Sequence, residues 1–209
     1  MLRHELAARA EGHASLAGVD EAGRGPLAGP VVAAAVSFDW DWLEREGEKA
    51  LVGLTDSKKL SLKRREFFYS MLTEGNPVIR WSVGEASVEE IERLNILRAT
   101  YTAMGRALRG LGEGIDFALV DGLPVEGLPI PHRAIVGGDG ASWSIAAASV
   151  IAKVTRDQWM KAADAKWPGY GFAQHKGYGT KAHLEALERL GPCPLHRKSF
   201  LPARQGLLF

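Results

Sequence analysis

Apolar residues occur along the chain in short continuous runs that are separated by turn-forming residues. Three of these runs, residues 16–19, 31–36 and 117–120, have the length and apolar content of buried strands. Residues 78–83 alternate enough between apolar and polar positions to predict another strand, and residues 133–136 have a strand-like composition. The pattern therefore predicts a β-sheet with buried strands.

The clearest helical pattern follows the 78–83 strand. Ser87 and Glu90 form a capping box, and apolar residues then recur every three or four positions over residues 91–108. Asn95 lies off this apolar stripe, where a surface residue is expected. The pattern predicts one long amphipathic helix whose stripe faces the core.

Serine residues in front of apolar stretches predict where two further helices begin. Ser61 would cap a helix over residues 61–73, and Ser142 or Ser144 would cap an alanine-rich helix that runs to about residue 167. A short helix is expected over residues 180–190.

The order of these elements predicts a mixed sheet in an α/β fold. The long helix permits a right-handed crossover that places the 117–120 strand parallel to the first strand. Asp20 and Asp121 would then be neighbours at one edge of the sheet. We expect a core over residues 1–167 and a basic helical appendage over residues 168–209.

The composition is that of an ordinary globular protein, with 209 residues, 46% hydrophobic and 24% charged. The net charge of +1 neither favours nor excludes nucleic acid as a ligand, so any basic surface must come from local segregation of charge. Residues 174–204 carry six Lys or Arg against two acidic residues, which makes this part basic. Residues 39–48 are acidic and are interpreted as a solvated connection.

Several classes of protein are disfavoured by the sequence. A single cysteine, Cys193, excludes an internal disulfide and a cysteine-rich zinc site, which fits a reducing compartment. The first residues carry charges and lack an apolar segment, so no secretory signal is predicted. The longest uncharged run, residues 25–38, is too short to span a bilayer. We expect a cytoplasmic enzyme or binding protein.

Four carboxylates, Asp20, Glu21, Asp121 and Asp139, end apolar segments and form the candidate site. One aspartate in such a place more often caps a turn, but four in the same context favour a metal site. Oxygen-only ligands suit hard cations such as Mg²⁺ or Mn²⁺. Two such ions can activate a water molecule and clamp the oxygens of a phosphoryl displacement.

A glycine-rich turn over residues 23–29 follows the first pair of acids. Its spacing differs from a dinucleotide fingerprint, and Pro26 removes an amide that a phosphate cradle would use. The glycines instead allow the backbone to approach a ligand closely, and a ribose 2′-hydroxyl would fit that role. Arg24 could hold a phosphate. The chain has no serine or cysteine nucleophile pattern, and the spacing of its histidines does not predict a metal site.

Seven stretches of the chain match the motifs of one family, and they occur in that family's order. They are GVDEAGRGPLAGPVVAAAV (18–36), DSKKL (56–60), NILRATYTAM (95–104), LVDG (119–122), GGD (137–139), SIAAASVIAKVTRD (144–157) and YGFAQHKGYGT (170–180). The chain resembles the type 2 ribonucleases H, and specifically the bacterial ribonuclease HII family. The resemblance extends over residues 16–200, and the combination of motifs is highly specific.

The resemblance implies a ribonuclease H-like α/β fold, with a mixed five-stranded sheet flanked by helices and a small helical C-terminal appendage. It implies an endonuclease that cuts RNA in RNA/DNA hybrids and cuts on the 5′ side of single ribonucleotides in duplex DNA, as in ribonucleotide excision repair. The products would carry 3′-hydroxyl and 5′-phosphate ends. The four carboxylates would be catalytic and would bind two Mn²⁺ or Mg²⁺ ions, with Asp20 bridging them.

The resemblance also assigns residues that would bind the substrate. Gly23, Arg24 and Gly25 would read the ribose 2′-hydroxyl, and Tyr178 would recognise the step from ribonucleotide to deoxyribonucleotide. One departure is Gly137, where the family usually has Lys, so a positive charge beside Asp139 is missing. The lysines expected to hold phosphates are Lys58, Lys59, Lys176 and Lys181.

The last five residues, QGLLF, resemble the peptide by which bacterial replication proteins dock on the sliding clamp. Gln205, Leu208 and Phe209 would be the anchors. Five residues match easily by chance, so an unstructured hydrophobic end is the alternative interpretation.

Two other functions fit the same fold. One is a nuclease or resolvase that acts on DNA alone, which a duplex with one ribonucleotide would distinguish from an all-DNA duplex. The other is a non-catalytic module that binds hybrids, which would require at least one of the four acids to be replaced, and none is. We expect the chain to act as a monomer and not to contact a membrane.

Overall fold

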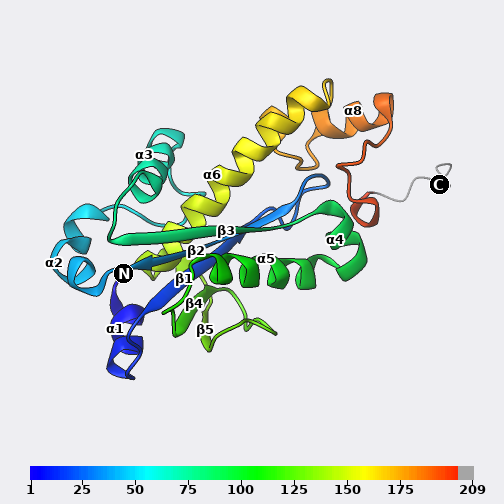
Figure 1. The fold of residues 1–209 in the computed structure, drawn as a ribbon. Helices are drawn as coiled ribbons and strands as arrows, with labels where there is room; N and C mark the ends of the chain where they lie inside the picture. Colours follow the sequence, from blue (N-terminus) through cyan, green and yellow to red (C-terminus); the bar gives the residue numbers. More distant parts are fainter. Residues whose placement is uncertain (202–209) are drawn as a thin grey trace.

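A mixed five-stranded sheet with helices on both faces forms the centre of the molecule (Figure 1). The computed structural model describes residues 1–201. The strand order is β3–β2–β1–β4–β5; β2 is antiparallel to β1 and β3, and β4 is parallel to β1 and β5. The predicted mixed sheet is confirmed. The strands are β1 (Leu16–Ala22), β2 (Val31–Phe38), β3 (Ile79–Ala86), β4 (Phe117–Asp121) and β5 (His132–Ile135).

Two long helices cover the two faces of the sheet. α5 packs against β3 and β2, and α6 packs against β1 and β2 on the opposite face. Strand β2, which lies between β3 and β1, is buried along its whole length, because alternate side chains face α5 and α6. The helices are α1 (Arg3–Ala10), α2 (Trp40–Ala50), α3 (Leu62–Thr73), α4 (Val88–Leu94), α5 (Ile96–Gly110), α6 (Trp143–Lys166), α7 (Phe172–His175) and α8 (Lys181–Leu190), with short 3-10 turns η1 (Gly138–Gly140) and η2 (Lys198–Phe200).

The parallel pairing of β1 with β4 places the candidate acids at one end of the sheet. The register pairs Val19 with Val120, so the next residue along each strand is an aspartate. The crossover that joins β3 to β4 through α4 and α5 allows this parallel arrangement. The predicted neighbourhood of Asp20 and Asp121 is therefore confirmed.

A close contact between β1 and α6 fixes the geometry next to these acids. A Cβ atom at Gly18 would lie only 2.0 Å from the carbonyl carbon of Ser144, so the strand and helix backbones meet there without intervening side chains. Residues Ala146, Ala147 and Ala148 of α6 are fully buried. Small residues on both sides therefore let α6 lie directly on the strand that carries Asp20.

The serine caps of the sequence analysis are confirmed. Ser61 Oγ accepts a hydrogen bond from Arg64 N at 3.3 Å at the start of α3. Ser142, not Ser144, caps α6 and accepts from Ile145 N at 3.2 Å. Each helix therefore begins where its cap predicts.

The acidic segment 39–48 belongs to a helix and is not the solvated connection that its charges predict. Asp39 caps α2, and its Oδ1 accepts a hydrogen bond from Trp42 N at 2.9 Å. Leu43 and Gly47 are buried on one side of this helix. The prediction is wrong because buried positions four residues apart are enough to hold a surface helix whose other positions are charged.

The predicted long helix over residues 91–108 is in fact two helices that meet at Asn95. The Ser87–Glu90 capping box is confirmed at the start of α4. Asn95 has a φ of 66°, a left-handed conformation that ends α4, and its Oδ1 accepts from Arg98 N at 3.1 Å to cap α5. Asparagine tolerates this conformation better than most residues, and the apolar spacing alone does not reveal the break.

Residues 170–195 pack on the distal part of α6 and on the loop between β1 and β2. Met160 of α6, Phe172 of α7 and Ala186 of α8 share an apolar cluster with Ala28 of that loop. The predicted helix over residues 180–190 is confirmed as α8. The division into a core of residues 1–167 and an appendage of residues 168–209 stays a prediction.

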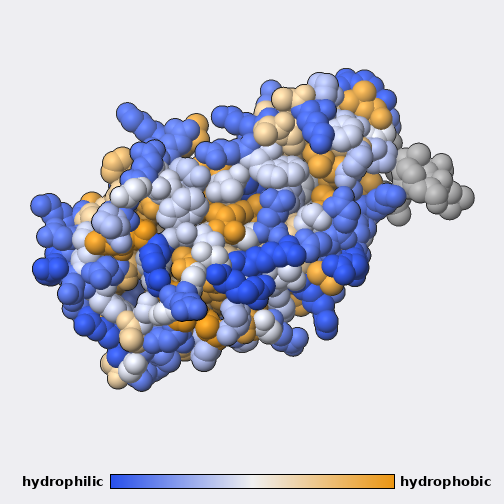
Figure 2. Space-filling model, in the orientation of Figure 1, coloured by the Kyte–Doolittle hydropathy of each residue, from blue (hydrophilic) through white to orange (hydrophobic). Residues whose placement is uncertain are grey.

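Hydrophilic residues dominate the face of the molecule shown in Figure 2, and hydrophobic residues form small separate groups there. Most of the large apolar side chains that the structure describes lie in buried clusters on both faces of the sheet. Within residues 1–201, no helix combines the length and the apolar character needed to cross a bilayer.

Candidate active site

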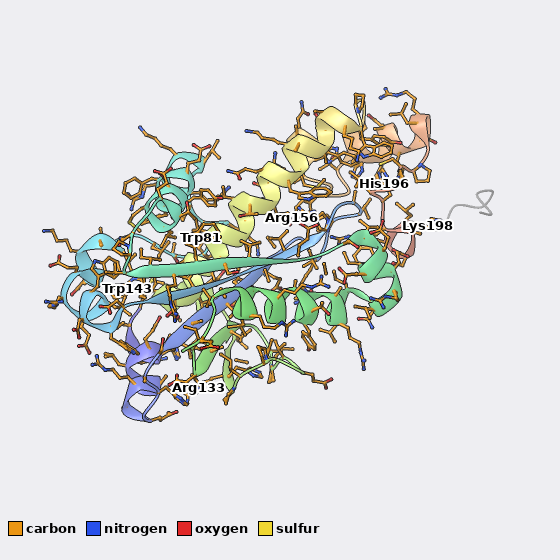
Figure 3. All side chains as sticks on the ribbon, viewed as in Figure 1. Trp81, Arg133, Trp143, Arg156, His196 and Lys198 are labelled. Atoms are coloured by element: carbon orange, nitrogen blue, oxygen red, sulfur yellow. The ribbon has the colours of Figure 1, made fainter. Side chains whose placement is uncertain are left out.

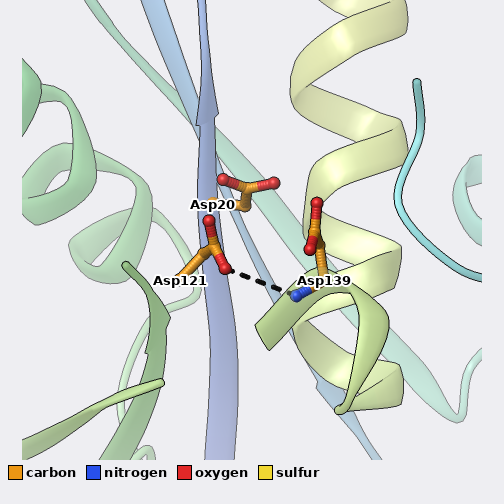
Figure 4. Close-up of side chains that lie close together, drawn as sticks. All are labelled: Asp20, Asp121 and Asp139. Carbon is orange, nitrogen blue, oxygen red and sulfur yellow. Dashed lines mark hydrogen bonds between the residues drawn. The ribbon is translucent and has the colours of Figure 1, made fainter. Parts of the chain in front are cut away.

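Three aspartates from separate elements meet at the end of the sheet. Asp20 lies on β1, Asp121 is the last residue of β4, and Asp139 lies in the 3-10 turn η1 that precedes α6. One carboxylate oxygen of each lies within 4.8 Å of those of the other two, and their side chains point toward one another (Figure 4). The Asp139 amide also donates to Asp121 Oδ1 at 3.4 Å. We call these residues the aspartate cluster.

The electrostatics of the aspartate cluster favour a bound cation. Asp20 is only 6% exposed. Burial raises its pKa well above the ordinary range, and the nearby charges of Glu21 and Asp121 raise it further. Burial and the charge of Asp121 likewise raise the pKa of Asp139. Crowded oxygen donors without nitrogen or sulfur are the ligand set that Mg²⁺ and Mn²⁺ prefer, so the residues present fit such ions.

Glu21, the fourth predicted acid, lies beside this cluster and not within it. Successive side chains of a strand point to opposite faces, so Asp20 and Glu21 diverge. Glu21 Oε1 accepts a hydrogen bond from Arg24 Nη1 at 3.2 Å. Burial raises the pKa of Glu21, and the charge of Arg24 opposes that rise. The structure therefore brings three of the four predicted acids together and places the fourth next to them.

Two buried serines that the sequence prediction missed connect Asp20 to neighbouring segments. Ser149 of α6 forms a hydrogen bond with the Asp20 side chain. Its hydroxyl also lies 2.9 Å from that of Ser57, and both serines are buried. These contacts connect Asp20 to α6 and to the segment that carries Lys58.

A pocket of about 370 Å³ opens beside Asp20. Gly23, Arg24 and Gly25 of the turn line it, together with Tyr178. Tyr178 is 43% exposed, and its Cε1 would lie 4.0 Å from a Cβ atom at Gly25. Lys58 and Lys153 contribute two cations to the lining of the same pocket. A concave site that joins carboxylates, cations and an exposed aromatic ring suits a phosphodiester with an attached base.

Comparison with known proteins decides the family. A family model described as Ribonuclease HII matches residues 17–203. The chain belongs to the ribonuclease HII family. It is 49% identical to Ribonuclease HII of Syntrophotalea carbinolica over 94% of this chain and 90% of that protein. It is 53% identical to the Rhodospirillum rubrum protein of the same name, over 92% and 86% of the two chains.

A solved structure agrees with this assignment. The Archaeoglobus fulgidus RNase HII, determined in a PCNA:RNase HII complex, matches with a TM-score of 0.71 and 26% sequence identity, over 92% of this chain and 98% of that one. The ribonuclease H-like fold is confirmed, and membership of the ribonuclease HII family makes the chain a ribonuclease H endonuclease.

The four lysines predicted to hold phosphates lie in different environments. Only Lys58 lines the pocket. Lys59 is exposed and its Nζ lies 3.8 Å from Asp56, while Lys181 is exposed with its Nζ 3.7 Å from Glu185. Lys176 donates its ammonium to the Ala173 carbonyl, and burial lowers its pKa. The pocket cation that the sequence analysis missed is Lys153, whose Nζ is 2.7 Å from Asp157 Oδ1.

Asp56 is a further acid that the sequence analysis missed. After burial and Asp121, it is the next contributor to the raised pKa of Asp139, through its charge and through a side-chain hydrogen bond. Its Oδ1 also accepts from Lys58 N at 2.9 Å. The signal was present in the DSKKL motif, but Asp56 does not follow a predicted strand as the other acids do.

The glycine that replaces the family's usual Lys occupies a left-handed position. Gly137 has a φ of 67° and is exposed, and a Cβ atom there would meet nothing within 4 Å. Glycine adopts this conformation without strain. Compared with lysine, it lowers the strain in the backbone of the turn but leaves the site without a positive charge.

The anchors predicted for clamp binding, Gln205, Leu208 and Phe209, lie outside the described residues. Two buried arginines, Arg156 and Arg197, contact the loop between β1 and β2 and were also missed by the sequence analysis. Arg197 is about 170 positions away from its partners in the chain, which no local pattern reveals.

Proposed function

We propose that this ribonuclease H hydrolyses the RNA strand of RNA/DNA hybrids and cuts on the 5′ side of single ribonucleotides in duplex DNA. The proposal rests above all on the aspartate cluster, whose carboxylate oxygens lie within 4.8 Å of one another beside a pocket lined by the 23–25 turn. The reacting phosphate and the sugar contact would thus share one cleft. We propose that the products carry 3′-hydroxyl and 5′-phosphate ends.

Asp20, Asp121 and Asp139 would hold two divalent ions, with Glu21 beside them. When bound, such ions supply an activated water and stabilise the charge that develops on the phosphate oxygens. Burial and neighbouring carboxylates raise the pKa of Asp20 and of Asp139, which supports a bound cation as their counter-charge. Mg²⁺ and Mn²⁺ both suit the oxygen ligands, and we propose either as the working metal.

The pocket residues would bind and orient the nucleic acid. Arg24 and Lys58 offer positive charge to phosphates that flank the scissile bond. The exposed ring of Tyr178 offers a face on which a base or sugar can stack. Phosphate contacts would set the register, while the 23–25 turn and Tyr178 would supply selectivity for the sugar.

A cleavage assay tests this function directly. A labelled duplex with one ribonucleotide, the same duplex made only of DNA, and a long RNA/DNA hybrid are incubated with Mg²⁺ or Mn²⁺. We expect cuts in the first and third substrates only, with the first cut immediately 5′ of the ribonucleotide. Equal cleavage of the all-DNA duplex would instead support the DNA nuclease, and binding without cleavage would support the hybrid-binding module.

We also propose a protein partner for the C-terminal end. The Archaeoglobus fulgidus relative was solved in complex with PCNA, and the last five residues here resemble a clamp-docking peptide. Gln205, Leu208 and Phe209 would make the contact. Clamp binding by the purified full chain is compared with that of a chain lacking residues 205–209; unchanged affinity would contradict the proposal. We further propose that the enzyme is monomeric and cytoplasmic.

A further inference from the structure

The backbone of the loop between β1 and β2 is held by a single buried guanidinium from the C-terminal appendage. Arg197 is fully buried. It donates six hydrogen bonds, and every acceptor is a main-chain carbonyl between residues 23 and 30. The two that matter most for the pocket are Nη2 to Gly23 O at 2.6 Å and Nη1 to Arg24 O at 2.9 Å. A guanidinium carries five N–H donors in a rigid fork, so Arg197 directs nearly all of them at one loop.

A second buried arginine, Arg156 of α6, also donates hydrogen bonds to carbonyls of this loop. Arg156 is 1% exposed, and it lies on α6 beside the β1–β2 pair (Figure 3). Its Nε donates to Pro30 O and its Nη2 to Ala28 O, each at 3.0 Å, while its Nη1 reaches Lys176 O at 3.0 Å. The last contact connects the loop to the segment that carries Tyr178.

Glycine at position 23 is required for this packing. Gly23 has a φ of 96°, and a Cβ atom there would lie 2.0 Å from Arg156 Nε and 2.8 Å from Pro30 O. A side chain would therefore displace the guanidinium and strain the backbone together. The glycine and the arginine form one packed unit.

The orientation of the carbonyls fixes the orientation of the amides. In a planar trans peptide the C=O and the following N–H point in opposite directions, and the described chain has no cis peptide bond. The Gly23 and Arg24 carbonyls point inward to Arg197, so the amides of Arg24 and Gly25 point away from it. Among residues 1–201, the structure shows no hydrogen-bond acceptor for either amide. Both residues are exposed and line the pocket beside Asp20.

The charge of the two arginines is balanced by carbonyl dipoles and not by acids. Neither guanidinium forms an ion pair with a described residue. Burial lowers the pKa of Arg197 to about 9, which still leaves the group protonated at neutral pH. Two buried cations without carboxylate partners are costly. The main-chain carbonyls supply most of the compensation, and the Arg197 guanidinium also lies 5.1 Å from the centroid of the Phe200 ring.

We propose that Arg197 and Arg156 are positioning residues for ribose recognition. Arg197 holds the Gly23 and Arg24 carbonyls inward so that the amides of Arg24 and Gly25 face the sugar, and Arg156 fixes the same loop through the carbonyls of Ala28 and Pro30 and through its packing against Gly23. The ligand of these two amides would be an oxygen of the ribonucleotide, with its 2′-hydroxyl as the group that distinguishes it from DNA. This inference rests on the proposed function. It makes the appendage, through Arg197, part of the selectivity of the enzyme.

The test compares affinity for two duplexes that differ in one hydroxyl. Fluorescence anisotropy in EDTA gives the Kd of the full chain for duplex DNA with one ribonucleotide and for the same duplex made only of DNA. The variants are Arg197→Lys and Arg156→Lys, which keep the positive charge but lose the planar guanidinium with its five N–H donors. Arg189→Lys is the matched control, because Arg189 lies in the same appendage, is exposed, and donates to Gly169 O at 3.1 Å.

The wild type and Arg189→Lys are expected to bind the ribonucleotide duplex more tightly by about tenfold, the value of one or two net hydrogen bonds. Arg197→Lys and Arg156→Lys are expected to bind the all-DNA duplex as the wild type does, because phosphate contacts are intact. Their preference should fall to about twofold or less. In Mg²⁺, KM for the ribonucleotide duplex should rise while kcat changes by less than about threefold, which separates positioning from loss of the fold.

Three outcomes separate this inference from the proposed function. A wild type that binds both duplexes equally would contradict ribose recognition as a whole. A wild type that discriminates, with folded Arg197→Lys and Arg156→Lys variants that discriminate equally well, would overturn the positioning role alone. Failure of both variants to fold, under conditions in which Arg189→Lys folds, would also overturn it, because the pair would then be structural.

Discussion

The aspartate cluster and the arginine-held loop lie side by side but are built in opposite ways. The cluster places acids of one sign close together, and burial with mutual repulsion raises the pKa of Asp20 and Asp139. The loop is held by two buried cations whose partners are neutral carbonyls. The aspartate cluster is left with negative charge that a ligand can neutralise. In the loop, the carbonyls and the two guanidiniums already form hydrogen bonds with each other.

This difference indicates a division of labour. Unbalanced negative charge costs stability in the protein alone but favours the binding of cations that do chemistry. A satisfied, rigid loop offers preorganised amides that can read a sugar without further ordering. We expect substitutions in the two regions to have distinct and partly opposite effects.

The largest expected effect is the loss of chemistry from the aspartate cluster. Asp121→Asn removes one negative charge from the proposed metal site, and we expect kcat to fall by about a thousandfold or more, equivalent to about 4 kcal/mol of transition-state stabilisation. Hybrid binding in EDTA should change little. Single-turnover cleavage measures the rate; Asp41→Asn, at an exposed acid on α2, is the control. A normal rate for Asp121→Asn would remove this residue from the metal site.

The next effect concerns stability and belongs to the loop. Arg197→Met leaves several buried carbonyls without donors, and we expect the free energy of unfolding to fall by about 3–5 kcal/mol. Urea unfolding followed by circular dichroism measures it. Arg189→Met, at an exposed position of α8, should lower the free energy of unfolding by less than about 0.5 kcal/mol. Equal losses for the two variants would show that the six contacts of Arg197 contribute little.

Acidification is expected to destabilise the protein through His196. His196 is buried, and burial lowers its pKa from 6.5 to about 4. The unfolded chain therefore binds a proton between these values that the folded chain does not, so stability is fully present above pH 6.5 and is lost as pH falls toward 4. We expect a loss on the order of 2 kcal/mol from this group. Urea unfolding at pH 7 and pH 5 in EDTA tests this. His196→Gln should reduce the difference in unfolding free energy between the two pH values, and His4→Gln should leave that difference unchanged.

Removal of a charge from the aspartate cluster should raise the stability of the metal-free protein, whereas removal of Arg197 from the loop should lower it. The folded pKa of Asp20 lies well above its ordinary value of 3.8. The metal-free folded state therefore holds a proton that the unfolded state releases, and stability falls as pH rises through this window. Asp20→Asn removes this penalty, so its Tm in EDTA at pH 7 should exceed that of the wild type by about 2–4 °C for each kcal/mol regained. Mn²⁺ should raise the wild-type Tm and leave the variant unchanged; a lower Tm for the variant in EDTA would contradict this view of the cluster.

The smallest effect is expected at Gly137. Gly137→Lys restores the cation that the family usually has but places a side chain at a φ of 67°. We expect a stability cost of about 1 kcal/mol and a decrease in KM of about twofold. Gly137→Ala, which has the same backbone cost without the charge, is the control. Identical KM values for the two variants would show that a positive charge there does not reach the substrate.

Asp20 and Asp121 were predictable because each directly follows an apolar run in the sequence. Asp20 and Asp121 end segments whose pattern is visible in the sequence, and the parallel pairing of β1 and β4 follows from the crossover. The break at Asn95 and the helix over residues 40–50 were not predicted, because a left-handed residue and a few buried positions leave no periodic signal. Arg197 was missed for a different reason. Its partners lie at the other end of the chain, and a basic residue in a basic segment looks exposed.

The separation of chemistry from ribose recognition is tested most directly by measuring two quantities for Asp121→Asn and Arg197→Lys. These are the single-turnover rate at saturating enzyme and the ratio of Kd values for the all-DNA and ribonucleotide duplexes. For Asp121→Asn, we expect the single-turnover rate to fall by about a thousandfold and the ratio of Kd values to stay as in the wild type. For Arg197→Lys, we expect the rate to stay within about threefold of the wild type and the ratio of Kd values to fall toward one. Parallel loss of both quantities in both variants would contradict the account.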